Sequence, residues 1–190
     1  KSLVNVEFRP IGLNLVVGRN NAGKTNLCRA LRFLGLTSRM SLDDAVQKCT
    51  AEPWNLLNAY STIHTMVFEL ECELSTPSGL ISRFQYKLEL AAPEKGAPRS
   101  GSPLRVSFEE LRISGGSAED LVLMDNRAGK VRLLHEGRLR SFGLLNPWVH
   151  EAMPGLADLE AEYVSTTAPL TSTMLSRLYD LETNRAANRF

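Results

Sequence analysis

The residues from Gly18 to Thr25 have the types and the spacing of a loop that binds phosphate. They read Gly-Arg-Asn-Asn-Ala-Gly-Lys-Thr, which satisfies every fixed position of the pattern G-x-x-x-x-G-K-[ST]. Gly18 and Gly23 permit backbone angles and a close approach that a side chain would block. Successive backbone N–H groups can therefore turn inward around an anion. Lys24 supplies a positive charge for the β- and γ-phosphates, and the Thr25 hydroxyl suits Mg²⁺.

The pattern predicts a bound nucleoside triphosphate with Mg²⁺, in which Thr25 is the one metal ligand from the loop. The predicted nucleotide-binding residues are Gly18, Arg19, Asn20, Asn21, Ala22, Gly23, Lys24, Thr25 and Asn26. No catalytic residue is assigned.

Two elements must flank the loop if it is to hold phosphate. Leu13–Val17 is nearly all apolar and rich in β-forming residues, which predicts a strand buried on both faces. After the loop, apolar residues return with helical spacing on one face, at Leu27, Ala30, Leu31 and Leu34. Gly35 is expected to end this helix as its C-cap. The amino end of the helix would add unsatisfied N–H groups and the positive end of its dipole.

The middle of the chain predicts an antiparallel sheet, because apolar and charged residues alternate there with period two. The expected strands are Met66–Leu74, Phe84–Leu90, Leu104–Ile113, Leu121–Met124 and Val131–Leu134, preceded by a half-buried strand at Val4–Phe8. Pro77–Gly79 should turn the first hairpin, and residues 125–130 the last. At Glu109–Glu110 the alternation slips by one, which predicts a β-bulge.

Helices are expected in three further places. Ser41 should cap a short helix that ends near Cys49. Helix signals return from Asn146, and an amphipathic helix should begin near Leu170. The composition of residues 91–103 predicts a loop. The expected organisation is a strand–loop–helix core at 1–50, an antiparallel β-subdomain at 51–145, and a helical segment at 146–190.

Composition and charge exclude several classes of protein. The chain has 190 residues and three widely spaced cysteines, which suits neither a disulfide framework nor a zinc site. This cysteine pattern favours a reduced, cytoplasmic protein. No apolar run is long enough to span a bilayer, so no membrane partner is expected. The net charge is only +1, but residues 1–40 carry seven basic residues against Glu7 alone. That cluster favours polyanions, although solvated basic faces are the simpler interpretation.

The wording of the loop resembles one family of phosphate-loop proteins. Asn14 to Leu27, which reads Asn-Leu-Val-Val-Gly-Arg-Asn-Asn-Ala-Gly-Lys-Thr-Asn-Leu, is similar to the ATPase heads of the RecF, SMC and OLD group. Lys1–Phe8 resembles the opening of that family from partway through, so its first strand would be missing. The resemblance covers roughly residues 1–36, and beyond them it rests on an antiparallel sheet inserted after the loop helix.

The resemblance implies an α/β fold, namely lobe I of an ABC-type P-loop ATPase head with an antiparallel β-subdomain. It implies ATP and Mg²⁺ as cofactors, with Lys1 and Ser2 near the nucleotide. Such heads hydrolyse ATP between two copies, so a second head would be a partner, and DNA or phage defence would be the context. The family also needs a signature Ser-Gly, a Walker B aspartate followed by glutamate, and a switch histidine.

One segment imitates two of those motifs. Ile113–Ser117 reads like a signature and Leu121–Asp125 like a Walker B strand. A signature must open a helix of several turns before that strand, yet only the four residues Ser117–Asp120 intervene, about one helical turn. Asp125 is followed by Asn126 rather than glutamate. A meander of strands and turns is therefore the preferred interpretation, and the chain would hold half of an active site.

Two other functions stay open. A small phosphate-loop kinase would favour a parallel sheet with alternating helices, and the alternation in the middle of the chain predicts an antiparallel one. A GTPase would need an N-K-x-D motif, which the sequence does not contain. A non-catalytic nucleotide-sensing or scaffold module would keep the loop and lack a catalytic carboxylate.

Overall fold

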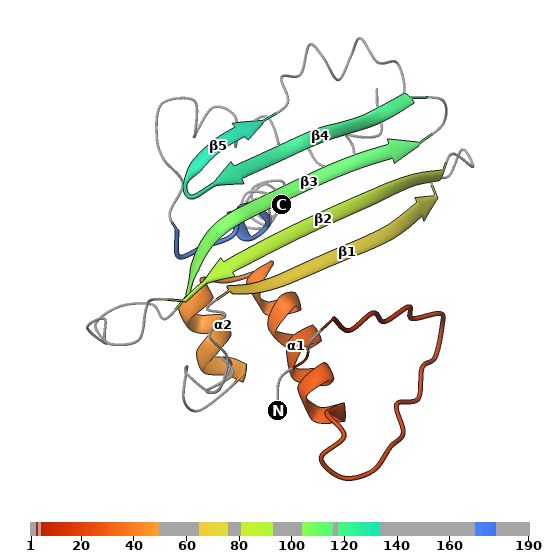
Figure 1. Cartoon of the computed structure of the whole chain (residues 1–190). Coiled ribbons are helices and arrows are strands. Elements are labelled where there is room, and N and C mark those ends of the chain that lie inside the picture. Colours follow the sequence, from red (N-terminus) through yellow and green to blue (C-terminus); the bar gives the residue numbers. More distant parts are fainter. Residues whose placement is uncertain are drawn as a thin grey trace, which may run out of the picture.

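Two helices precede five strands in the computed structural model, which describes residues 3, 5–49, 65–75, 81–92, 104–115, 118–133 and 170–177 (Figure 1). The helices are α1 (Lys24–Thr37) and α2 (Leu42–Cys49). The strands are β1 (Thr65–Ser75), β2 (Ile81–Ala91), β3 (Arg105–Gly115), β4 (Ala118–Arg127) and β5 (Lys130–Leu133). A further helical turn spans residues 174–177.

The strands form one open antiparallel sheet in the order β1-β2-β3-β4-β5. This confirms the predicted sheet, including the hairpin of β1 and β2. The last hairpin is tighter than expected, because β4 runs on to Arg127 and only Ala128 and Gly129 turn the chain. Both turn residues have positive φ, 48° and 90°, as a two-residue hairpin turn requires. The Asn126 side chain accepts the Gly129 N–H at 2.9 Å.

The predicted bulge exists, but its position was wrong. The register between β2 and β3 shifts between Glu89 and Leu90, so Ser107 of β3 has no partner in β2. The register between β3 and β4 shifts again between Leu111 and Arg112. A bulge before Glu109 moves every later side chain to the opposite face. Glu109 consequently points inward with Leu111, whereas Glu110 points outward.

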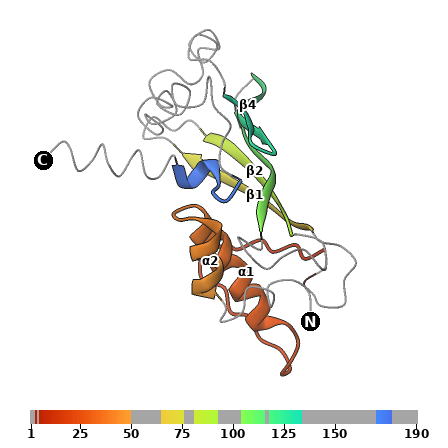
Figure 2. The ribbon, with the colours of Figure 1, turned by 90° about the vertical axis from the view of Figure 1, so that its left-hand side faces the viewer.

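One apolar core lies between the inner face of the sheet, the carboxyl-terminal part of α1, α2 and residues 170–177 (Figure 2). β2 contributes four inward residues, because its alternation places Phe84, Tyr86, Leu88 and Leu90 on that face. The helices contribute Phe33, Leu42, Ala45 and Val46, and the later segment contributes Met174. The amphipathic pattern read from the sequence therefore places the apolar side of the sheet correctly.

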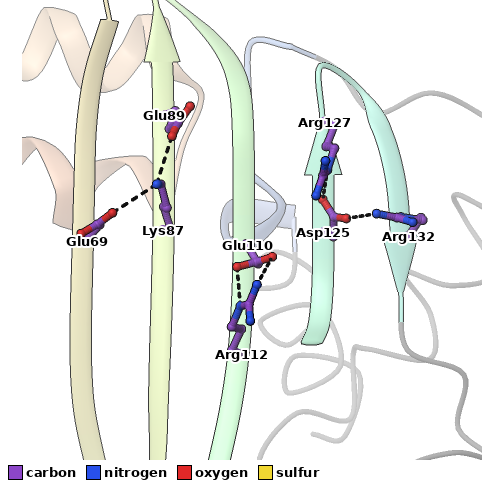
Figure 3. Close-up of polar contacts among 8 residues, drawn as sticks. All are labelled: Glu69, Lys87, Glu89, Glu110, Arg112, Asp125, Arg127 and Arg132. Atoms are coloured by element: carbon purple, nitrogen blue, oxygen red, sulfur yellow. Dashed lines mark hydrogen bonds and ion pairs between the residues drawn. The ribbon is translucent and has the colours of Figure 1, made fainter. Parts of the chain in front are cut away.

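The outer face of the sheet carries a ladder of charges in register (Figure 3). One cross-strand row joins the five strands and contains Glu69, Lys87, Glu110, Asp125 and Arg132. The Lys87 ammonium lies 3.2 Å from a carboxylate oxygen of Glu69. Two carboxylates, Glu110 and Asp125, are neighbours in this row, and like charges there are destabilising unless compensated. Arginines provide the compensation, at Arg112, Arg127 and Arg132.

The two helices begin where expected, and one of them ends later. The Ser41 hydroxyl accepts the Asp44 N–H at 3.2 Å and caps α2, as predicted. Gly35 is not the C-cap of α1: the helix continues to Thr37, and Ser38 follows in a right-handed conformation. Thr37 is buried and its carbonyl accepts the hydroxyl of Thr173 at 2.6 Å, so a tertiary contact holds the last turn of the helix beyond the glycine. In the segment 170–177 the helical turn starts at 174.

The predicted strands at Val4–Phe8 and Leu13–Val17 are absent from the described residues. Leu13 is fully exposed and Leu15 is 85% exposed, so the expected burial on both faces was wrong for this structure. A buried strand needs hydrogen-bonded neighbours, and the five described strands pair only with one another. The described fold is thus mixed α/β with an antiparallel sheet, and no parallel sheet carries the glycine loop.

Several expectations fall outside the described residues. They concern the turn at 77–79, the loop from 93 onward, the helix signals between 146 and 169, and the helix beyond 177. No helix in the described ranges combines the length and apolarity needed to cross a membrane.

Candidate nucleotide-binding loop

The glycine loop leads directly into α1, which begins at Lys24, and two loop residues have left-handed backbone angles. Gly23 is the N-cap residue with φ of 99°, in the left-handed region that favours glycine. Asn21 also has positive φ, 64°. The Ala22 N–H donates to the Arg19 carbonyl at 3.2 Å, and the Leu27 N–H donates to the Gly23 carbonyl at 3.0 Å. The loop is therefore a tight turn that delivers the chain into a helix.

The Lys24 side chain folds back over the loop rather than extending into solvent. Its ammonium donates to the Gly18 carbonyl at 2.5 Å and to the Arg19 carbonyl at 2.8 Å. An ammonium has three donors, so one N–H of Lys24 remains beyond these two bonds. Lys24 is half-buried, and the backbone fixes the place of its charge at the mouth of the loop. This position suits a cation that neutralises phosphate oxygens beside the helix end.

The N-cap residue of α1, Gly23, makes no side-chain cap, and no acidic residue lies in the first turn of the helix. The first amides of any helix have no acceptor inside the helix. The nearest acid in sequence, Glu7, is paired with Arg9 at 2.5 Å. A phosphate group would satisfy these amides and would gain from the positive end of the helix dipole.

Thr25 has an exposed position in the first turn of α1, where its hydroxyl can reach an ion held by phosphate oxygens. Within the described ranges, no group of three or more histidine, cysteine, aspartate or glutamate residues could hold a metal.

The loop lies at the end of α1 that points away from the sheet (Figures 1 and 2). The opposite end of α1 packs into the core through Phe33 and Thr37. α1 therefore connects the exposed glycine loop to the part of the fold that is anchored in the core. Arg19 in the loop and Arg29 and Arg32 on the helix are exposed and raise the local positive charge.

The other sequence candidates are not brought to this loop by the described structure. Lys1 and Ser2 lie outside the described residues. Asp125 lies in β4, where its carboxylate accepts a hydrogen bond from the Arg127 Nε at 3.2 Å and also forms an ion pair with Arg132. Ser114 and Gly115 lie at the end of β3, and Gly115 pairs directly with Ala118 of β4. The segment is therefore a strand hairpin, which confirms the meander preferred over a signature helix and a Walker B strand.

Sequence reasoning missed the most unusual polar residue of the core, Glu109. Its side chain is completely buried, and its carboxylate accepts the Tyr86 hydroxyl at 2.8 Å. It also accepts the N–H of Met174 at 2.7 Å and that of Leu175 at 3.2 Å. The slip in the alternation of apolar residues could have shown that Glu109 faces inward. The bulge was predicted at Glu109, two residues after its actual position at Ser107, so this orientation was missed.

Burial raises the pKa of the Glu109 carboxyl above its ordinary value of 4.5, and its hydrogen bonds offset part of this rise. Asn126 lies directly opposite in β4, and its amide also lowers the pKa. The Asn126 Nδ2 is nevertheless not placed to form a hydrogen bond of normal length and angle with any described atom. Burial together with the charge of Glu109 raises the pKa of Tyr86 well above 10.0.

The resemblance stated from the sequence rests on the sequence of residues 1–36 alone. Comparison with known proteins found no matching family model, no matching curated relative and no matching solved structure.

Proposed function

We propose that the chain binds a nucleoside triphosphate, ATP with Mg²⁺, at Gly18–Thr25. One observation carries the proposal: three features occur together at this loop. Gly23 has a left-handed conformation, the helix start has no side-chain cap, and the Lys24 ammonium is held over the loop. The Lys24 charge and the amino end of the helix favour an anion, and the positive φ of Gly23 requires a residue without a side chain, which lets the backbone approach that anion closely. Hydrogen bonds between charged groups are stronger than neutral ones, at about 1.5–3 kcal/mol each.

The residues of the loop divide the work of binding. The backbone N–H groups at the start of α1 would donate hydrogen bonds to the phosphate oxygens, and Lys24 would add a positive charge beside them. Thr25 would hold Mg²⁺ through its hydroxyl, and the ion would supply further positive charge against the phosphates. None of these groups removes a proton from water, so the loop supports binding and positioning rather than the complete hydrolysis of ATP.

The wider proposal is that this chain is the amino-terminal lobe of an ABC-type ATPase head of the RecF, SMC and OLD group. It is supported by the wording of residues 14–27 and by an antiparallel sheet that follows α1. In this proposal the head works in the cytoplasm with a second head across the nucleotide, and acts on DNA or in phage defence. The exposed apolar residues 13–17 would then supply a strand to the sheet that carries the loop.

A second candidate, a nucleotide-sensing module without catalysis, is favoured by one observation. The carboxylate that could imitate a Walker B residue, Asp125, is held by Arg127 and Arg132 on the sheet. In both views β4 lies on the side of the molecule opposite the loop (Figures 1 and 2). A sensing module keeps the binding half of the site, so both candidates predict binding and they differ in turnover.

Titration calorimetry with ATP, GTP and tripolyphosphate, each with Mg²⁺, tests the proposal. Lys24→Ala should weaken the binding of all three by roughly 10- to 100-fold, because it removes one charge-assisted contact. Lys48→Ala removes an exposed lysine from the last turn of α2 and serves as the matched control. Equal affinity of the native chain and Lys24→Ala for ATP would refute the assignment of the loop.

A further inference from the structure

Residues 170–177 are attached to every other layer of the described fold. The Leu42 N–H at the start of α2 donates to the Thr171 carbonyl at 2.8 Å. The Val106 N–H of β3 donates to the Leu170 carbonyl, also at 2.8 Å. These bonds join segments that lie more than sixty residues apart in the sequence. Figure 2 shows the turn at 174–177 against the sheet and beside the helices.

Thr173 joins the ends of two helices with a single hydroxyl. It donates to the Thr37 carbonyl at 2.6 Å, which satisfies a terminal carbonyl of α1. The same oxygen accepts the Ser176 N–H at 3.1 Å, so Thr173 is also the N-cap of the helix that starts at Met174. Thr173 is completely buried. The end of α1 and the start of the later helix therefore share one capping group.

Glu109 fixes this junction to the sheet from below. One carboxylate oxygen accepts the Met174 N–H, and the other accepts the Leu175 N–H and the Tyr86 hydroxyl. A carboxylate at the amino end of a helix satisfies orphan donors and complements the helix dipole. Removing one partner of such a buried set leaves a donor without an acceptor, which costs more than the bond itself gains.

We infer that Glu109 and Thr173 form a latch that makes α1 and the helix starting at Met174 move as one unit. Glu109 accepts a hydrogen bond from the start of the later helix, and Thr173, the residue before that helix, donates a hydrogen bond to Thr37 at the end of α1. A displacement of α1 would therefore reach residues 170–177 without passing through the loops between them. Where that displacement comes from phosphate binding, the inference rests on the proposed function; the latch itself does not.

Hydrogen exchange measured by NMR on the full chain tests the latch without ligand. In Glu109→Gln, an NH₂ group replaces one oxygen and faces either the Met174 N–H or the Leu175 N–H, so one of these amides loses its acceptor. That amide should exchange roughly 10- to 100-fold faster. Through the loosened segment, the Leu42 and Val106 amides should also exchange faster.

The matched control is Glu110→Gln, because Glu110 is the next residue in β3 but faces outward and pairs with Arg112. It should leave those amides unchanged. A second variant, Thr173→Val, removes the bond to Thr37 and leaves Glu109 in place. It should speed exchange at Arg39 and Met40, whose amides donate to the Leu36 carbonyl at the end of α1.

Three results would overturn the inference. One is unchanged exchange at Leu42 and Val106 in Glu109→Gln, because the segment would then not depend on the carboxylate. Another is unchanged exchange at Arg39 and Met40 in Thr173→Val. The third is faster exchange by the same factor in the paired strands β1 and β2, which would show general destabilisation instead of a local latch.

Adding ATP with Mg²⁺ separates the latch from the proposed function. Where the loop amides 23–25 become protected, the native chain should also change exchange at Met174 and Leu175, and Glu109→Gln should not. Protection at the loop without any change at those amides would contradict the coupling. No protection at the loop would contradict phosphate binding alone, and the ligand-free comparison would still decide the latch.

Discussion

Two glycines of the same helix region should respond to alanine in opposite ways. Neither Gly23 nor Gly35 has an atom within 4 Å of the place where a Cβ would stand, so steric contact does not distinguish them. Gly23 has φ of 99°, where an L-residue is strained by about 1–2 kcal/mol. Gly35 lies inside α1, where alanine is favoured by roughly 0.5–1 kcal/mol.

For Gly23→Ala the strain falls on the loop that is proposed to hold phosphate. If the loop relaxes to a conformation without positive φ, binding must restore the strained one. That restoration costs about 1–2 kcal/mol, which raises the dissociation constant for ATP roughly 5- to 30-fold. Gly35→Ala should leave the dissociation constant unchanged and raise the free energy of unfolding by about 0.5–1 kcal/mol.

The assays are calorimetry for ATP affinity and urea unfolding for stability, applied to both variants. Native affinity in Gly23→Ala would refute the claim that positive φ at this residue is needed for binding. A loss of ATP affinity in Gly35→Ala equal to that in Gly23→Ala would show that the helix as a whole, not the loop, responds to the change.

The remaining predictions concern the sheet. Burial raises the pKa of Glu109, so between pH 4.5 and the raised pKa the folded chain binds more protons than the unfolded chain, and stability falls as pH rises through this range. Glu109→Gln should remove this fall in urea midpoints, whereas Glu110→Gln should keep it; identical pH profiles for the native chain and Glu109→Gln would contradict it. Asp125→Asn should lower stability by about 1 kcal/mol or less, because its arginine partners are 64% and 74% exposed. The same variant should bind ATP normally in calorimetry, and a loss of binding would show that Asp125 belongs to the nucleotide site.

Local patterns in the sequence predicted most of the sheet. Strand alternation is set by which face is buried, so β1 and β2 could be placed before any contact was known. Ser41 followed by Asp44 predicted the start of α2 in the same way, because capping involves only neighbouring residues. The phosphate motif, likewise, lies within a single turn and helix start.

Features that depend on distant segments could not be predicted in this way. The left-over residue of β3 is fixed by how β2 and β3 pair, so the bulge fell at Ser107 and Glu109 turned inward. The acceptors of the amides at Met174 and Leu175 come from that inward turn. α1 passes Gly35 because Thr37 is anchored by Thr173, a residue far along the chain. The segment 13–17 has strand propensity, but propensity alone does not supply a neighbouring strand.

The most direct test of phosphate binding is the change in melting temperature that ATP with Mg²⁺ causes in the native chain and in Lys24→Ala. At a ligand concentration about 100 times the dissociation constant, binding stabilises the folded state by about 2.7 kcal/mol. For a chain of this size that is a rise of roughly 5–10 °C. We expect this rise in the native chain and in Lys48→Ala. In Lys24→Ala, binding that is 10- to 100-fold weaker leaves about 0.4–1.4 kcal/mol at the same ATP concentration, so the rise should shrink to roughly 1–5 °C. An equal rise in Lys24→Ala, or none in the native chain, would contradict phosphate binding at this loop.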